Sequence, residues 1–224
     1  SSGGVDQKFE YGGKVDQFLI LSGAPYGNPG FTGIMHAETR YGQDAIGLGG
    51  SASPSNIAML YPKPGSNETA ITGLILQQAL SERVAITAGK FQAVDLTDML
   101  IHNGRGVEGF MNTSLALLPL TLARTTNLSI MGAGILAMEG KETQGGVMVY
   151  DTNDSATTSG FDELFADGVA LSAELRLPTC FFNLPGHQDF GATWNSKEYI
   201  ALGQDPRVVL PGSGIPITPK NGSW

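Results

Sequence analysis

The segment GVALSAELRL, residues 168–177, alternates between two kinds of side chain along its whole length. Successive side chains of a β-strand point to opposite faces, so this pattern predicts a strand with one apolar and one polar face. The apolar face carries Val169, Leu171, Ala173, Leu175 and Leu177, and the other face carries Gly168, Ala170, Ser172, Glu174 and Arg176.

The segment FTGIMHAETRY, residues 31–41, repeats the pattern, with Ile34, His36, Glu38 and Arg40 opposite Phe31, Gly33, Met35, Ala37 and Tyr41. A soluble β-sandwich also alternates, but its polar face meets bulk water. Apolar residues toward lipid and polar residues toward a lumen are typical of an outer-membrane β-barrel. We therefore expect an all-β, antiparallel transmembrane β-barrel, with a soluble β-sandwich as the alternative.

Composition narrows the function classes. The chain has 224 residues, with 13 Lys+Arg, 21 Asp+Glu and a formal net charge of −8. It has no basic cluster to neutralise phosphates, so we expect no nucleic-acid partner. Charged residues make up 15%, below the roughly 25% of soluble domains, and no apolar run approaches the roughly 20 residues of a membrane helix. Both observations favour the barrel.

Clusters of Gly, Pro, Asn and Asp separate nine segments that we expect to be strands. We see no domain linker, so residues 1–224 are predicted to be a single β-barrel domain. The expected strands are residues 7–21, 31–41, 70–80, 84–91, 112–118, 127–137, 145–150, 168–177 and 187–200.

The connections differ in length: residues 81–83 form a tight turn, whereas residues 42–69 and 92–111 are long. Bacterial barrels have short periplasmic turns and long outer loops. The turn at residues 81–83 should then be periplasmic, so the strand at residues 7–21 runs toward the periplasm. Because the N-terminus of such barrels normally lies in the periplasm, at least one strand should precede it. The sequence ends in a loop-like segment, and a sheet with open edges in lipid costs several kcal/mol per unpaired group. We therefore expect about half of a larger barrel, truncated at both ends.

Several segments, in this order and spacing, resemble the carbohydrate-selective porins of Gram-negative outer membranes. The similarity covers most of the chain. The segments are HAETRYG (residues 36–42), SASPSN (51–56), LSERVAITAGKF (80–91), GRGVEGFMN (104–112), MVYDTNDSATTSGFDELFADGVALSAEL (148–175) and LPGHQDFGATWNSKEY (184–199).

This resemblance implies the N-terminal part of a sixteen-stranded barrel in the bacterial outer membrane that passes sugars by passive diffusion. It implies no enzymatic activity and no cofactor. The expected partners are small saccharides and outer-membrane lipid, and assembly of several copies is left open. Two alternatives are a soluble carbohydrate-binding β-sandwich and a structural porin-like subunit of an envelope complex.

The first set of candidate site residues is the polar wall of three strands. A charge on the lipid side costs about 2–4 kcal/mol at the midplane, so charged side chains should face the lumen. The alternative is that these acids and bases only satisfy one another. The predicted pore-lining residues are Glu38, Arg40, Glu174, Arg176, Asp189, Asn195 and Lys197.

The second set lies in the long connection at residues 92–111. With one strand missing upstream, this loop follows the fifth strand, and in general porins that loop folds into the barrel and narrows it. Arg105 stands between Gly104 and Gly106, and its planar guanidinium can bond two adjacent hydroxyls. The alternative is an ordinary surface loop. The predicted constriction residues are Asp98, His102, Asn103, Arg105 and Glu108.

Two further points concern metals and one lysine. His36, His102 and His187 lie on separate segments without ligand spacing, so no metal site is expected. Strict alternation puts Lys90 on the lipid side with Ile86 and Ala88. It could reach the outer rim with its long side chain, or a bulge near Gly89 could turn it inward. Its role is left open.

Overall fold

The computed structural model describes residues 8–44, 56–96, 104–109, 111–112, 127–140 and 142–197. In these residues one eight-stranded antiparallel sheet runs in simple sequence order from β1 to β8, with short 3-10 helices in the connections. The elements are β1 (Gly12–Ser22), η1 (Ala24–Tyr26), β2 (Phe31–Gly42), η2 (Ile57–Leu60), β3 (Glu68–Ala79), β4 (Val84–Gln92), η3 (Gly104–Gly106), β5 (Ser129–Glu139), β6 (Glu142–Asp151), β7 (Val169–Phe181) and β8 (Leu184–Asn195).

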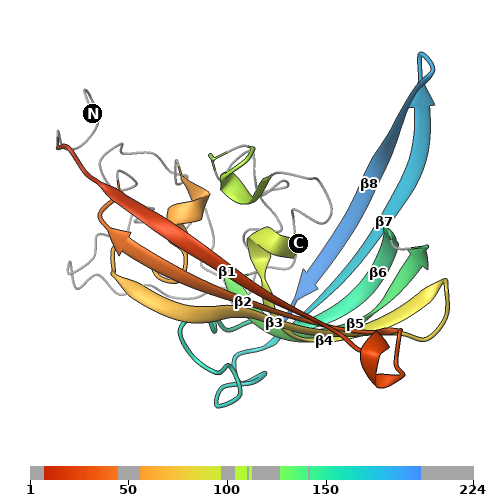
Figure 1. Cartoon of the computed structure of the whole chain (residues 1–224), viewed down its shortest axis with the longest axis horizontal. Helices are drawn as coiled ribbons and strands as arrows, with labels where there is room; N and C mark the ends of the chain where they lie inside the picture. Colours follow the sequence, from red (N-terminus) through yellow and green to blue (C-terminus); the bar gives the residue numbers. More distant parts are fainter. Residues whose placement is uncertain are drawn as a thin grey trace.

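The sheet curls into a trough, and β1 and β8 form its two rims (Figure 1). This confirms the all-β, antiparallel, partial-barrel prediction. Eight of the nine expected strands are present, with shifted ends. The remaining expected strand, at residues 112–118, falls almost wholly outside the described residues. Asn112 itself lies in a bend. Among the described residues, no helix is long and apolar enough to cross a membrane.

The two faces of the sheet differ as the alternation predicts. On the convex face, Leu171, Leu175 and Phe190 are each about half exposed, at 43%, 50% and 55%. No second sheet covers them in the described part of the chain, which removes the support for a β-sandwich. The concave face carries the apolar cluster of Phe91, Ile130, Met148, Tyr150 and Ala170, together with most of the polar side chains.

One irregularity interrupts the pairing of β2 with β3. His36 pairs with Gly73 but Ala37 pairs with Ile71, so Thr72 is an extra residue, a β-bulge. Pairing of β3 with β4 begins only at Leu74, so nearby carbonyls need other donors. Side chains supply them: Lys90 Nζ donates to the Ile71 carbonyl at 2.7 Å, and Ser129 Oγ donates to the Thr72 carbonyl at 2.6 Å.

Lys90 stays on the convex face, because the pairing of β4 shows no register shift near Gly89. It is nevertheless only 7% exposed, because residues 152–168 fold back over this face. We call this segment the flap; Figure 1 shows it below β3 and β4. Lys90 Nζ donates to the flap carbonyl of Thr158 at 2.8 Å, and Gly160 lies against Met131. The flap therefore covers the lysine.

The flap is also fixed at its base. Asp151 Oδ1 accepts the backbone N–H groups of Thr152 and Phe165, at 2.7 and 3.2 Å. Asp154 Oδ1 accepts the N–H of Ser129 at 2.9 Å, and burial raises the pKa of the Asp154 carboxyl. These bonds hold both arms of the flap to the ends of β5 and β6.

A lysine substitution tests the attachment of the flap. In Lys90→Met the two hydrogen bonds to Ile71 and Thr158 are lost while the aliphatic bulk is kept. We expect chymotrypsin to cleave the flap, at Phe161 or Phe165, at least several-fold faster than in the wild type, measured on the detergent-solubilised protein. The exposed Lys63 provides the control, and Lys63→Met should not change the rate. Equal rates in all three proteins would contradict the attachment.

Candidate functional site

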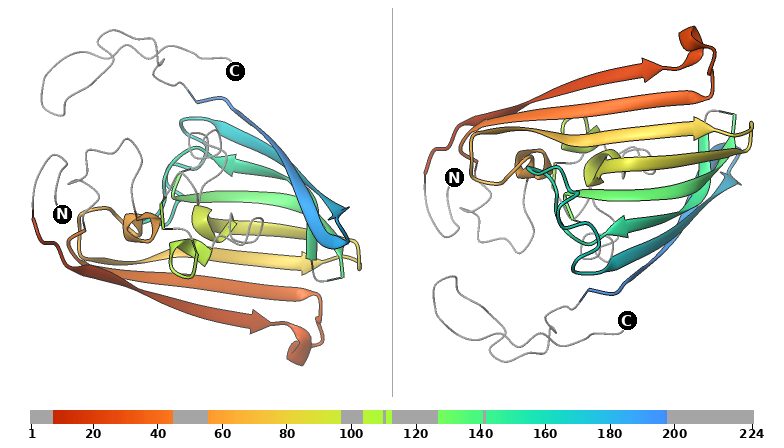
Figure 2. Two further views of the ribbon diagram at one scale, coloured as in Figure 1. Left: turned by 90° about the horizontal axis from the view of Figure 1, so that it is seen from above. Right: turned by 90° about the horizontal axis from the view of Figure 1, so that it is seen from below.

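The described parts of the connections that follow β2 and β4 fold onto the concave side of the trough. Figure 2 shows η2 and η3 lying inside the curve of the sheet. The two segments contact each other: the N–H of Ile57 donates to the carbonyl of Met111 at 2.8 Å, and Gly106 lies against Ile57. A helical turn at residues 93–96 continues directly from β4, and the N–H of Ala93 donates to the carbonyl of Leu128. The described parts of these connections therefore lie on the concave side.

A small apolar core holds these segments together. It consists of Ile57, Leu60, Tyr61 and Val94, with Leu128 packed against it. Tyr61 is fully buried, and this burial raises the pKa of its hydroxyl well above the usual value. The Nζ of Lys14 lies 5.7 Å from the centre of the Tyr61 ring, so this core borders directly on charged groups of the sheet.

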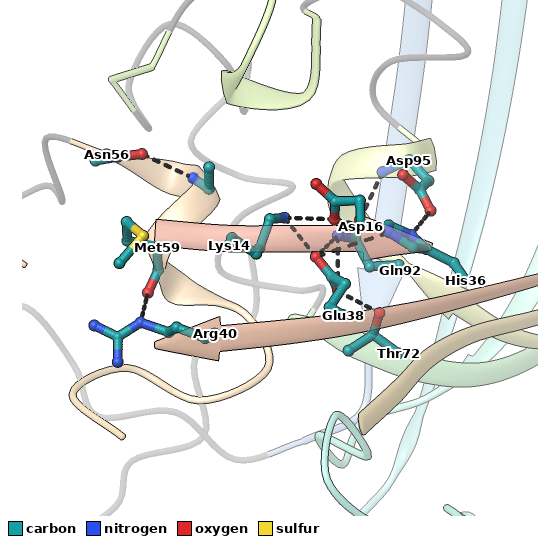
Figure 3. A network of polar contacts seen from close by, with 11 residues as sticks. Lys14, Asp16, His36, Glu38, Arg40, Asn56, Met59, Thr72, Gln92 and Asp95 are labelled. Carbon is teal, nitrogen blue, oxygen red and sulfur yellow. Dashed lines mark hydrogen bonds and ion pairs between the residues drawn. The ribbon is translucent and has the colours of Figure 1, made fainter. Parts of the chain in front are cut away.

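Those charged groups form a buried network on the concave face of β1 and β2 (Figure 3). The side chain of Glu38 is fully buried and lies 2.5 Å from Lys14 Nζ. Thr72, at the bulge, donates to the same carboxylate, and the side-chain amide of Gln92 lies 3.4 Å from both of its oxygens. A buried carboxylate must be paired and hydrogen-bonded, and Glu38 has partners from three strands.

His36 links the network to the helical turn. Its Nδ1 lies 2.6 Å from Asp95 Oδ2, and its Nε2 lies 3.0 Å from Asp16 Oδ1. Gln92 strengthens the same connection, because its Oε1 accepts the N–H of Asp95 at 2.7 Å. The sheet and the start of the 92–111 connection are thus tied at one place.

This network is an ion-pair cluster and not a metal centre. Donor atoms of Asp16, His36 and Glu38 lie within 4.8 Å of one another. However, Lys14 Nζ lies 3.0 Å from Asp16 and 2.5 Å from Glu38, so the cation is already supplied. Both ring nitrogens of His36 are also engaged by carboxylates, which leaves no lone pair directed at a metal.

Arg105 lies on the same wall. Its guanidinium carbon is 4.7 Å from the centre of the Phe18 ring, and the Phe18 ring stacks on His36 at 4.0 Å with an interplanar angle of 24°. Phe18 and His36 are register partners on β1 and β2. The backbone of Arg105 is left-handed, with φ 52° and ψ 26°.

The opposite wall is more open. Arg176 Nε donates to Asp189 Oδ1 at 2.9 Å across the β7–β8 pair, and His187 Nε2 lies 3.3 Å from Asp189 Oδ2. Glu174 lies on the same face, two residues before Arg176. Asp189 and His187 keep 30% and 39% of their side-chain surfaces exposed, so this wall presents accessible charged groups.

The remaining candidates that the structure describes lie in three places. Glu38 and Arg40 are buried, and Arg40 bonds the carbonyls of Met59 and Ser66 and the carboxylate of Asp44. Lys197 lies at the end of β8, where its Nζ is 3.2 Å from the Thr152 carbonyl and 3.6 Å from Asp167, and its N–H donates to Asn195. Glu108 is exposed, whereas Asp98, His102 and Asn103 lie outside the described residues.

Several residues that build this wall were not among the predicted site residues. Lys14, Asp16 and Phe18 alternate along β1 just as His36, Glu38 and Arg40 do along β2, so the same periodicity could have identified them. Thr72 gave no such signal, because its inward position depends on the bulge.

The model of the carbohydrate-selective porin, OprB family, matches residues 27–224. No curated protein sequence matches the chain. Among solved structures, the chain is similar to the high-pH structure of OprB from Pseudomonas putida, with 15% sequence identity and a TM-score of 0.65. The similarity covers 88% of this chain and 49% of that one, so the chain spans about half of its length.

Removing Lys14 tests the buried network. Lys14→Met leaves the Glu38 carboxylate buried without its cation, which typically costs about 3–5 kcal/mol. We expect a clear loss of unfolding free energy, measured by denaturant titration in detergent.

The double variant Lys14→Met/Glu38→Gln removes the uncompensated charge and should recover much of this loss. If the single and the double variant were equally stable, the ion pair would not be the source of the effect.

Proposed function

The chain belongs to the carbohydrate-selective porin family OprB, and from this premise we propose that it forms part of a channel for passive diffusion of small saccharides. Porins of this family reside in the Gram-negative outer membrane and are not enzymes. The observation that carries the proposal is the pairing of a polar, partly charged concave wall with an exposed apolar convex face. Such a wall faces water while its other side faces lipid.

In the proposed channel the saccharide passes between the β7–β8 wall and the segment around Arg105. Both walls carry charged hydrogen-bonding groups: Arg176, Asp189, Glu174 and His187 on one side, and Arg105 on the other. Selectivity in such pores comes from width, lining hydrogen-bond groups and local field. On the side of Arg105 the wall also carries Lys14, Asp16 and Asp95. Acids and bases are thus mixed on both sides, which favours neutral polyols over ions of either sign.

We assign supporting structural roles to the remaining candidates. Glu38 and Arg40 hold the infolded segments from behind, because both are buried. Asn195 and Lys197 belong to the outer rim next to the flap. We keep Asp98, His102, Asn103 and Glu108 as proposed groups of the constriction on the basis of their positions in the sequence.

The proposal is tested with the full-length protein in planar bilayers and in liposomes. We expect an ion-conducting pore whose current falls as a neutral saccharide is added, and swelling of liposomes in isosmotic sugar. A correctly folded, membrane-inserted protein without ion conductance would overturn the porin proposal and favour the structural role in an envelope complex.

Single substitutions connect the activity to the wall. A hydrogen bond to a charged group is worth about 1.5–3 kcal/mol, so Arg105→Ala should raise the saccharide concentration at half-maximal block at least about tenfold. Arg176→Ala, on the opposite wall, should change the block in the same direction. Arg83→Ala, in the short turn far from both walls, should leave the block unchanged. Similar values for Arg105→Ala and the wild type would remove Arg105 from the path.

A further inference from the structure

Phe18 is an exposed aromatic residue on a polar wall. It is 42% exposed, and its side chain shares the concave face with Lys14 and Asp16. Its register partner His36 is also on the inner face. A large apolar ring on the water-filled side of a barrel therefore needs a reason other than contact with lipid.

The stacked pair of Phe18 and His36 receives two contacts from one connection. Asp95, at the start of the 92–111 connection, lies 2.6 Å from His36 Nδ1. Arg105, ten residues later, places its guanidinium carbon 4.7 Å from the Phe18 ring centre. Since His36 and Phe18 stack at 4.0 Å, four side chains form one continuous row: Asp95, His36, Phe18 and Arg105.

The backbone of Arg105 indicates that its position is imposed by its surroundings. A left-handed conformation costs an L-residue roughly 1–2 kcal/mol, and Arg105 adopts it with φ 52°. Residues in such conformations persist where neighbouring contacts determine them, and they cluster at functional sites. Next to Arg105, Gly106 also has a positive φ of 73° and packs against Ile57, where a Cβ would collide.

We infer that Phe18 is a positioning residue for saccharide passage: it holds the Arg105 guanidinium at a fixed point of the wall through a cation–π contact, and His36 and Asp95 hold the Phe18 ring. The inference rests on the proposed function. It assigns Phe18 no contact with the sugar. Its effect is to keep the planar donor fork of Arg105 in one orientation, so that the fork meets a passing saccharide without first being ordered.

The experiment compares Phe18→Leu with the wild-type full-length protein in planar bilayers. An exposed cation–π contact of about 0.5–1 kcal/mol corresponds to a two- to five-fold change in an equilibrium constant. We therefore expect the saccharide concentration at half-maximal block to rise about two- to five-fold, with noisier open-channel current. Phe18→Tyr, which keeps the ring, should restore the wild-type values.

Two controls separate positioning from general destabilisation. Phe190→Leu makes the same chemical change on the convex face and should leave block and current noise unchanged. The melting temperatures of Phe18→Leu and Phe18→Tyr should stay close to that of the wild type. Asp95→Asn should act in the same direction as Phe18→Leu, and the double variant should show less than the sum of the two effects, because both substitutions loosen the same row.

The outcomes distinguish this inference from the proposed function. If the wild-type protein conducts and is blocked by saccharides but Phe18→Leu behaves identically, the positioning role is wrong while the channel stands. If Phe18→Tyr fails to restore the block, or if Phe190→Leu shifts it equally, the effect does not come from the ring over Arg105, and the inference is also overturned. If the wild type does not conduct, the channel proposal itself has failed.

Discussion

The buried Glu38 carboxylate must find its hydrogen-bond and ion-pair partners within the protein. Much of the concave side of β1 to β4 is arranged around this requirement. Its side chain is fully buried, and its partners come from different parts of the chain. Lys14 comes from the rim strand β1, Thr72 from the bulge in β3 and Gln92 from the end of β4. Removing one partner of a buried charge is strongly destabilising, so these three elements are constrained together.

Gln92 carries this constraint into the interior connection. Its amide nitrogen reaches Glu38, and its amide oxygen accepts the N–H of Asp95 at the first turn of the helical segment. Asp95 then reaches back to His36 on the sheet. The chain therefore leaves β4 already directed onto the concave wall. The inward course of the connection at this point follows from hydrogen bonding to the sheet, with the apolar core around Ile57 and Tyr61 packing behind it.

The sequence predicted those parts of the fold that depend on local pattern. Alternation in β2 and β7 identified the two faces, and the short turn at residues 81–83 separated two strands correctly. It could not predict the bulge at Thr72, because the extra residue is defined by pairing with another strand. Nor could it predict that Glu38 and Arg40 are buried, since partners such as Gln92 and Met59 lie far from them in the sequence.

The flap has a consequence for how the barrel sits in its bilayer. Lys90 and Met131 point outward, yet residues 152–168 separate them from the surroundings. The flap therefore keeps lipid tails away from the outermost residues of β4 and β5, and exposed convex surface begins only at the level of Ala88 and Ala133. A bilayer adapts to a shortened apolar wall by local thinning.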